Sequence, residues 1–325
     1  MTRVLITGGS GFIGTNLVEH YVARGDEVLN LDVARPRHPA HAAVWQQINL
    51  LDAPALAQAI ANFDPQIVLH MAARTDLSGA TVEDYPANTV GVSNLIQALR
   101  TLRALQLAVF ASSMLVCRIG YRPESEDDYA PSTAYGQSKI EGELRVRREA
   151  GSAMPWVMLR PTSIWGPWFG APYRDFFEAV QRGWYVHPHA RKIHRNYGFV
   201  LNAVHQIDRL VATGAEGLLH RTVYLADYQP IELKAWACLI QRELRARPVR
   251  EVPLLVLRLA ALLGDLLKAA HVRGFPMNSF RLNNLLTDSV LDTSAMERAV
   301  GALPYDLPAA VAITCRWMTS TTGRR

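Results

Sequence analysis

The stretch Thr7-Gly8-Gly9-Ser10-Gly11-Phe12-Ile13-Gly14 decides the fold, because it joins an apolar run to a stretch with helical spacing. The run before it, Arg3–Thr7, predicts a buried strand, and Phe12–Arg24 predicts a helix. Glycines have no Cβ, so they permit a tight turn and a close approach of a pyrophosphate to the backbone. The start of the helix adds free N–H groups and a positive dipole end. We therefore predict a dinucleotide phosphate site whose contacts come from Gly8, Gly11, Phe12, Ile13 and Gly14.

A carboxylate follows at the end of the second predicted strand. Val28–Leu31 predicts this strand and Asp32 ends it, roughly 20 residues beyond the glycines. A carboxylate there accepts hydrogen bonds from ribose hydroxyls and repels a 2′-phosphate, which favours NAD over NADP. Arg35 and Arg37 follow closely and soften that preference. NAD is the expected cofactor, with NADP as the less favoured alternative.

Apolar runs and helical stretches then alternate along the chain. The further predicted strands are Ile67–Met71, Ala108–Ser112 and Val157–Arg160, and the helices are Ala55–Asn62, Thr89–Leu102 and Ser132–Glu149. Strands that alternate with helices of this length predict an α/β protein with a doubly wound parallel sheet of the Rossmann type.

The pattern changes after Pro161, where proline, glycine and tryptophan become frequent. We expect residues 1–165 to form the dinucleotide-binding domain and residues 166–325 a smaller, mostly helical substrate lobe. Within residues 196–228, Tyr197–Leu201 and Thr222–Ala226 are expected to return to the main sheet as strands. Helices are predicted in the lobe at Leu233–Arg245 and Leu254–Ala270.

The composition excludes several classes of protein. The 325 residues are 49% hydrophobic and 19% charged, with a net charge of +5, which is typical of a globular protein and unlike a disordered chain. No stretch concentrates Lys and Arg among aromatics, so no nucleic-acid partner is expected. Cys117, Cys238 and Cys315 are widely spaced, and the N-terminal stretch lacks the pattern of a signal peptide, so we expect reduced thiols and a cytoplasmic protein.

The most apolar later stretch, Leu254–Val272, is interrupted by Arg258, Asp265 and Lys268. It is too polar and too short to span a bilayer comfortably. An amphipathic helix with no membrane partner is the preferred interpretation, and a helix that rests on a membrane surface is the weaker alternative.

Tyr135-Gly136-Gln137-Ser138-Lys139 places a phenol and an ammonium on one face of a helix. A nearby cation favours the phenolate and lowers the pKa of a tyrosine. Tyr135 could then take a proton from a substrate hydroxyl, or return one to a ketone, as hydride moves to or from the cofactor. A surface pair is the competing interpretation of such a spacing taken alone.

Residues 3–230 together resemble the extended short-chain dehydrogenase/reductase family, the NAD-dependent epimerase/dehydratase group. The glycine segment resembles T-G-x-x-G-F-x-G, and Asn49-Leu50-Leu51-Asp52 lies where the family has D-x-x-D beside adenine. His70-Met71-Ala72-Ala73 resembles the H-x-A-A turn beside the cofactor, and Asn88 resembles the Asn of N-x-x-G, which supports the active site. Arg160–Pro167 resembles the segment that packs by the nicotinamide. The resemblance implies catalytic roles for Ser113, Tyr135, Lys139 and Asn88, and adds the cofactor contacts Asn49, Leu50, Ala72, Ala73, Pro161 and Ser163 to Tyr135 and Lys139.

Three departures concern the substrate. Cys117 stands where the family's serine run usually continues to Tyr. Met114 and Leu115 follow Ser113 where dehydratases carry an acid, so dehydration is disfavoured. Many sugar-nucleotide enzymes of the family carry a C-terminal G-R-x-x-D segment whose Arg binds the diphosphate, and this sequence has no such segment.

Arg195 is the other candidate for that grip, in a segment that resembles R-x-F-x-x-V, so Ser113 and Arg195 are the expected substrate contacts. A salt-bridged surface arginine is an equally weighted alternative. His187, His189 and His194 lie nearby, but no third ligand with motif spacing supports a metal site, and none is expected. The tryptophans Trp165, Trp168 and Trp184 are expected in the core or an interface more than at the substrate.

The leading hypothesis is therefore an NAD-dependent epimerase of a nucleotide sugar. An NAD(P)-dependent reductase or dehydrogenase of a sugar nucleotide or sterol-like ketone is the alternative, and a non-catalytic dinucleotide sensor is the least favoured. The resemblance also implies a homodimer packed through the helices that start near Asn88 and Ser132.

Overall fold

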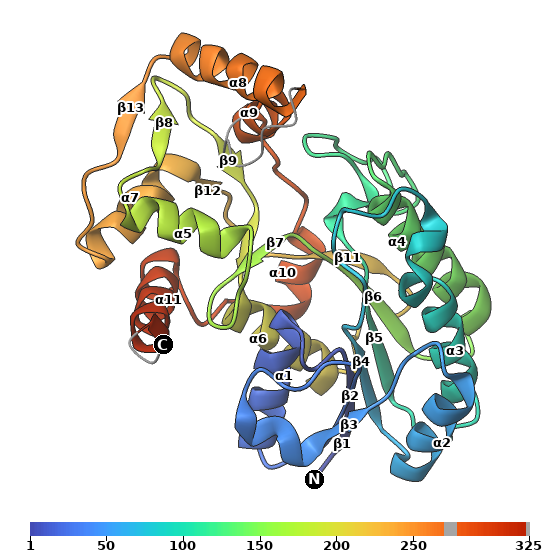
Figure 1. Ribbon diagram of the computed structural model, residues 1–325. Helices are drawn as coiled ribbons and strands as arrows, with labels where there is room; N and C mark the ends of the chain where they lie inside the picture. The colour runs from blue at the N-terminus through green and yellow to red at the C-terminus, as the bar shows by residue number, and fades with distance from the viewer. Residues whose placement is uncertain (270–277, 323–325) are drawn as a thin grey trace.

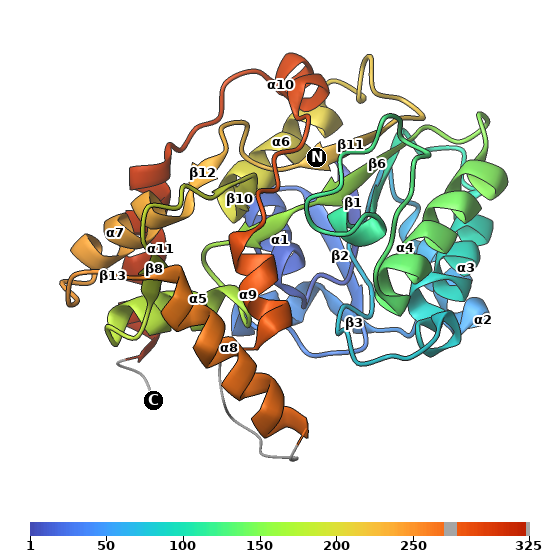
Figure 2. The ribbon, with the colours of Figure 1, turned by 90° about the horizontal axis from the view of Figure 1, so that it is seen from above.

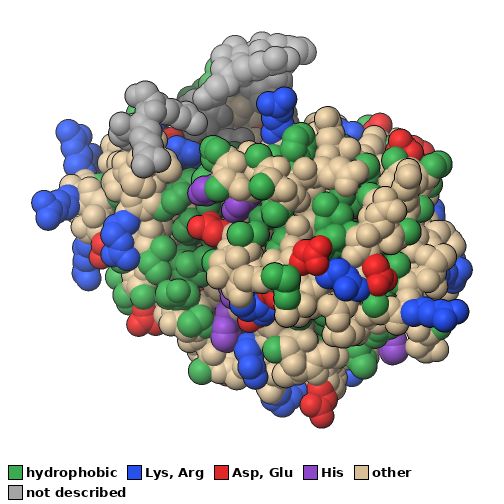
Figure 3. Space-filling view, turned by 90° about the horizontal axis from the view of Figure 1, so that it is seen from below, with side chains coloured by type: hydrophobic (Ala, Val, Ile, Leu, Met, Phe, Trp, Pro, Cys, Tyr) green, Lys and Arg blue, Asp and Glu red, His purple; other side chains and the backbone are tan. Residues whose placement is uncertain are grey.

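The computed structural model describes residues 1–269 and 278–322. Figure 1 shows a sheet covered by helices, with a second lobe of helices and short strands beside it. On the face drawn in Figure 3, lysines and arginines are scattered among acidic and apolar side chains rather than gathered in one stripe.

The main sheet has seven parallel strands in the order β11-β6-β5-β4-β1-β2-β3. They are β1 (Arg3–Thr7), β2 (Glu27–Asp32), β3 (Trp45–Gln47), β4 (Ile67–His70), β5 (Leu107–Ala111), β6 (Trp156–Pro161) and β11 (Thr222–Leu225). Thr7 pairs with Leu31 on one side and His70 on the other, so the strand order reverses at β1. In such sheets a ligand binds outside the carboxyl ends of the strands at this reversal.

Helices cover both faces of this sheet, as the two sides of Figure 2 show. One face carries α1 (Phe12–Ala23), α6 (Val200–Ala212) and α10 (Ser294–Val300), and the other carries α2 (Ala53–Phe63), α3 (Val90–Leu99) and α4 (Ala134–Arg145) with the π-turn Val146–Ala150. Leu17 and Ile207 are fully buried on the first face, and Ile60 and Leu95 on the second. The sheet is thus enclosed by two apolar layers, as a parallel sheet requires.

The second lobe has its own aromatic core, in which Trp165, Phe177 and Trp236 are buried together. Its strands form the pairs β7 (Ser163–Trp165) with β10 (Tyr197–Phe199), β8 (Val186–Pro188) with β13 (Arg250–Val252), and β9 (His194–Arg195) with β12 (Ile231–Glu232). Its helices are α5 (Tyr173–Gln181), α7 (Leu233–Glu243), α8 (Leu254–Ala269), α9 (Ser279–Leu286) and α11 (Leu307–Thr322).

The predicted α/β class and parallel sheet are confirmed, but one predicted strand was wrong. Tyr197–Leu201 does not return to the main sheet, because β10 ends at Phe199 and pairs with β7, while Leu201 already lies in α6. The apolar pattern of so short a segment does not specify its partner strand. Thr222–Leu225 does join the main sheet, next to β6. Residue 270, the predicted end of α8, lies outside the described residues, and the domain division at residue 165 stays a prediction.

Candidate active site

A close contact between two backbone segments brings Tyr135 next to Ser113. Thr133 caps α4 by accepting a hydrogen bond from the Gly136 nitrogen at 3.0 Å. A Cβ at Gly136 would lie 2.2 Å from the carbonyl oxygen of Leu115, so only glycine allows α4 to begin there. Ser113 in turn caps the short 3-10 turn Met114–Val116 by accepting from the Leu115 nitrogen at 3.1 Å.

The phenol of Tyr135 is buried and faces Ser113. Burial raises the pKa of Tyr135 above its usual value, and the hydrogen bond with Ser113 opposes that rise. The ring of Tyr85 meets the ring of Tyr135 edge-on at 5.9 Å and orients it. This is the arrangement of a hydroxyl pair that can exchange a proton with a bound alcohol.

Lys139 lies one helical turn beyond Tyr135 and is buried. Its Nζ donates a hydrogen bond of 2.8 Å to the carbonyl oxygen of Ala111, at the end of β5. Burial lowers the pKa of Lys139 to about 8, against the opposing field of Glu143. The ammonium is thus held below the segment that carries Ser113.

Asn88 connects the catalytic helix to a loop after β4. Its Nδ2 donates to the Ser138 hydroxyl at 2.9 Å and to the Arg74 carbonyl at 3.0 Å, and its Oδ1 accepts from the Arg74 nitrogen at 2.8 Å. Ser138 donates to the Tyr135 carbonyl oxygen at 2.7 Å. The side-chain amide of Asn88 therefore hydrogen-bonds both to the loop after β4 and to α4, as a residue that supports the active site would.

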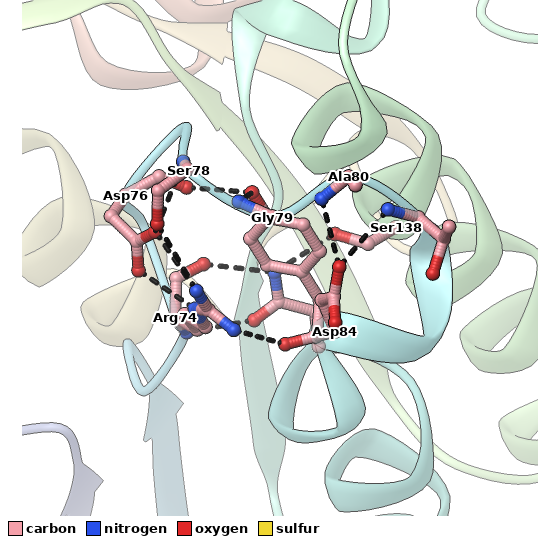
Figure 4. Close-up of polar contacts among 10 residues, drawn as sticks. Arg74, Asp76, Ser78, Gly79, Ala80, Asp84 and Ser138 are labelled. Carbon is pink, nitrogen blue, oxygen red and sulfur yellow. Dashed lines mark hydrogen bonds and ion pairs between the residues drawn. The ribbon is translucent and has the colours of Figure 1, made fainter.

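Figure 4 shows how this loop, residues 74–84, is held closed. The guanidinium of Arg74 donates to Asp76 Oδ2 at 2.7 Å and to the Asp84 carbonyl at 2.6 Å, and it lies over the ring of Tyr85 at 4.9 Å. The sequence-based search missed Arg74, although its place directly after the H-x-A-A segment was a usable signal.

A buried ion pair joins α4 to β6, and it was not predicted from the sequence. Arg160 donates to both carboxylate oxygens of Glu143, at 2.9 and 2.8 Å, and both side chains are almost fully buried. Ser112 and Tyr129 donate to the same carboxylate at 2.5 and 2.9 Å. The only sequence signal was the position of Glu143, four residues after Lys139.

The glycine segment forms a cradle at the reversal of strand order. Gly8 has φ +75°, and a Cβ there would lie 2.5 Å from the Ala72 nitrogen, so the backbone at Ala72, which Ala73 follows, passes directly beside it. A Cβ at Gly14 would lie 2.1 Å from the Gly8 carbonyl oxygen. No side chain caps α1 at Gly11, so the first-turn N–H groups that begin with Phe12 and Ile13 are left for an anion. These residues fit the diphosphate of NAD.

Two further groups border the cradle. Asp32 accepts from the Ser10 and Ala34 nitrogens at 3.0 and 2.9 Å, which leaves acceptor capacity on its carboxylate for ribose hydroxyls. Arg37 donates to the Ser10 carbonyl at 3.1 Å and the Trp168 carbonyl at 2.8 Å. Arg37 is therefore committed to backbone oxygens in this structure.

His70 ends β4 next to the cradle as a neutral imidazole. Its Nδ1 lies 2.7 Å from the Thr7 hydroxyl oxygen, and burial, with the Lys139 charge, lowers its pKa to about 3.

The remaining expected cofactor contacts are spread around this edge of the sheet. Leu50 is buried, and its carbonyl oxygen accepts a hydrogen bond from Asn94 at 2.8 Å. The Oδ1 of Asn49 accepts from the Leu51 nitrogen at 3.0 Å. Pro161 ends β6, and the Ser163 hydroxyl accepts from the Tyr173 hydroxyl at 2.5 Å.

Arg195 is held at the end of α9, where it donates to the carbonyl oxygens of Thr287, at 3.1 Å, and Asn284. His187 is buried between the Tyr185 hydroxyl and the Arg191 carbonyl, both at 2.9 Å. Within residues 1–269 and 278–322, no three metal-ligating side chains gather at one point.

The tryptophans have different places. Trp165 is fully buried in the core of the second lobe, as expected, and Trp168 packs on Trp317 at 5.8 Å. Trp184 is exposed beneath Arg182.

The model of the NAD dependent epimerase/dehydratase family matches residues 4–215. A 3β-hydroxysteroid dehydrogenase/Δ5→4-isomerase of Mycobacterium tuberculosis is 30% identical over 258 residues, which cover 72% of this chain and 67% of that protein. An N-acetyl-α-D-glucosaminyl-diphospho-ditrans,octacis-undecaprenol 4-epimerase of Escherichia coli O157:H7 is 23% identical over 310 residues, which cover 94% of this chain and 92% of that protein.

Among solved structures, the UDP-glucose 4-epimerase of Thermotoga maritima has the same fold, with a TM-score of 0.74, 17% identity, and coverage of 98% and 99% of the two chains. The family match spans the cradle, Ser113, Tyr135 and Lys139. The chain thus belongs to the NAD-dependent epimerase/dehydratase family and is an NAD-dependent enzyme of the extended short-chain dehydrogenase/reductase type.

Proposed function

We propose that the chain is a 4-epimerase of a nucleotide sugar, with Ser113, Tyr135 and Lys139 as its catalytic residues. The observation that carries the proposal is the buried contact of Tyr135 with Ser113, above an ammonium that is itself buried. NAD, if held by the glycine cradle and Asp32, would serve as the acceptor of a substrate hydride and as its donor in the return step. The enzyme therefore undergoes no net redox change in a full cycle.

The chain's own residues handle the proton. Ser113 donates a hydrogen bond to the substrate oxygen, and Tyr135 removes the hydroxyl proton as the C–H hydride leaves, which gives a ketone. The positive field of Lys139 favours the phenolate of Tyr135 and so lowers the cost of that step. When hydride returns to the opposite face of the ketone, Tyr135 gives the proton back to the alkoxide.

Asn88 acts in this proposal as a positioning residue, because it reaches Tyr135 only through Ser138. The epimerase of Escherichia coli O157:H7, which matches nearly the whole chain, supports the class of reaction. Neither Met114 nor Leu115, which follow Ser113, can act as a general acid or base, so the proposal disfavours dehydration.

A one-way dehydrogenase or reductase is the second candidate, and the position of Arg195 favours it. This guanidinium donates to the backbone carbonyls of Thr287 and Asn284, so Arg195 is not free to bind a nucleotide diphosphate in this structure. The 3β-hydroxysteroid dehydrogenase at 30% identity supports the same alternative. The relatives named above are enzymes, which disfavours a non-catalytic sensor.

The two candidates differ in their consumption of cofactor. The purified chain would be incubated with catalytic NAD and a panel of UDP-, GDP-, dTDP- and CDP-sugars, and separately with stoichiometric NAD and 3β-hydroxysteroids. Conversion of a sugar to its 4-epimer without NADH accumulation supports the epimerase. Stoichiometric NADH on any substrate, with no epimer formed, contradicts it and supports the dehydrogenase.

We also propose that two copies pair through α3 and α4, in the cytoplasm. Val90 of α3 and Leu144 of α4 are large apolar side chains that lie exposed on these two helices. The three cysteines, all in the described chain, form no disulfide, which suits a reducing compartment. The molar mass in solution, compared with that of Val90→Glu/Leu144→Glu, tests the pairing.

A further inference from the structure

Helix α8 exposes a stripe of large aliphatic side chains. They are between 50% and 69% exposed and comprise Leu255, Val256, Leu259, Leu262, Leu263 and Leu266. Their spacing of three or four residues places them on one face of the helix. The opposite face buries Leu257 and Ala261 against Leu282 of α9.

This stripe is unusual for a surface that faces only water. Large contiguous apolar patches on a protein surface mark interaction sites. In Figure 1, α8 lies at the outer edge of the second lobe, with α9 on its inner side. No helix in the described part of the chain is long and apolar enough to cross a membrane. The sequence alone favoured a helix with no membrane partner, since it did not show that the leucines point away from the lobe.

Unpaired cations lie beside the first turns of α8. The loop after β8 is held there by a hydrogen bond of 2.9 Å from the His189 nitrogen to the Val252 carbonyl. In this region Arg191, Lys192, Arg250 and Arg258 are exposed and have no carboxylate partner among the described residues.

The neighbouring carboxylates are already engaged. Glu251 pairs with Lys234 and, at 2.9 Å, with His189. Asp265 accepts from the Ser279 nitrogen at 3.3 Å. Asp265 keeps its charge, because a backbone N–H is neutral, but the four unpaired cations outnumber it, so the surroundings of the stripe carry a net positive charge.

We propose that α8 docks on the surface of an anionic lipid bilayer, with its aliphatic stripe at the boundary between headgroups and acyl chains. An aliphatic face flanked by cations is the pattern of a helix that lies in this boundary, where anionic headgroups attract Lys and Arg. A second copy of the chain fits less well. A two-fold contact through the same face brings the same cations of both copies together, which is unfavourable.

The docking face connects to the candidate active site through α9. Thr287, just after α9, accepts from Arg195, and a Cβ at Gly120 would lie 2.6 Å from its Cγ2. Gly120 belongs to the loop that follows Ser113. Docking of α8 therefore brings α9, and the Gly120 loop that contacts Thr287, close to the bilayer. The docking proposal does not depend on which of the two proposed reactions the enzyme performs.

The test is sedimentation of the full-length chain with vesicles of phosphatidylcholine alone and of phosphatidylcholine with phosphatidylglycerol. We expect binding to the mixed vesicles that falls about tenfold or more in Leu259→Gln/Leu263→Gln, because two exposed leucines that would enter the bilayer are lost. The matched control, Leu51→Gln/Leu219→Gln, changes two exposed leucines elsewhere and should bind as the wild type does. Equal binding by the α8 variant and the wild type, or no binding by the wild type, overturns the proposal.

The charges are tested in the same assay. Arg250→Gln/Arg258→Gln should weaken binding to the mixed vesicles, and added salt should do the same, whereas Arg103→Gln/Arg122→Gln removes two other exposed arginines and should not. Light scattering without lipid tests whether a second copy of the chain, rather than a membrane, covers the stripe. If Leu259→Gln/Leu263→Gln lowers the molar mass of the lipid-free protein, a second copy covers the stripe and the membrane proposal is wrong.

Discussion

The side-chain amide of Asn88 donates a hydrogen bond of 2.9 Å to the hydroxyl of Ser138, between Tyr135 and Lys139 on the same helix. Because Ser138 also bonds to the Tyr135 carbonyl, this amide fixes the start of α4 relative to the loop after β4. A small displacement of a reacting group can cost about 100-fold in rate.

Asn88→Ala should therefore lower kcat by about 100-fold while leaving NAD affinity nearly unchanged. Steady-state kinetics with a titration of NAD measures both. Asn94→Ala is the control, since it removes a similar amide bond, to the Leu50 carbonyl, away from α4. A wild-type kcat in Asn88→Ala would show that the amide does not position Tyr135.

Gly136→Ala should damage the site through sterics alone. The added Cβ would lie 2.2 Å from the Leu115 carbonyl oxygen, so the first turn of α4 must move away from the Ser113 segment. We expect a loss of about 1–3 kcal/mol in the free energy of unfolding and a large drop in kcat. Gly170→Ala, where a Cβ meets nothing within 4 Å, should change neither, as urea unfolding and kinetics would show.

Glu143→Gln should destabilise the fold strongly, because it leaves the buried guanidinium of Arg160 without its charge partner. Breaking a buried pair in this way costs about 3–5 kcal/mol, whereas replacing both partners by apolar residues is often close to neutral. Urea unfolding of Glu143→Gln and of Glu143→Leu/Arg160→Met measures the difference. If the single variant were as stable as the double variant, the pair would not be the buried ion pair described above.

His70 should make the stability depend on pH in the acid range. Its folded pKa of about 3 is lower than that of an unfolded histidine, so below pH 6.5 the unfolded state binds a proton that the folded state does not. The free energy of unfolding should fall by about 1.4 kcal/mol per pH unit between about pH 6 and pH 4 from this group alone.

His70→Gln should remove that part of the slope, and His189→Gln, at an exposed histidine, should retain it. Urea unfolding at several pH values compares the three proteins. Parallel slopes for wild type and His70→Gln would contradict a neutral buried imidazole.

The sequence predicted the groups that depend on short spacing and missed those that depend on long-range contacts. The glycine cradle lies within eight residues, and Tyr135 and Lys139 are one helical turn apart, so local rules located them. The Glu143–Arg160 pair joins a helix to a strand, and Arg74 meets Asn88 across a loop; neither partner predicts the other. The pairing of β10 with β7 was missed for the same reason, since three apolar residues fit either sheet. The exposed face of α8 could not be predicted either, because hydropathy does not say which leucines the lobe covers.

The most direct measurement of the central claim is the turnover of Tyr135→Phe on a substrate that the wild type converts. Tyr305→Phe is the matched control, because it removes a phenolic hydroxyl from a ring that packs on Phe199, outside the site. We predict that Tyr135→Phe binds NAD as the wild type does but loses at least about 100-fold in kcat, while Tyr305→Phe keeps wild-type turnover. Wild-type turnover by Tyr135→Phe would contradict the proton transfer assigned to this phenol.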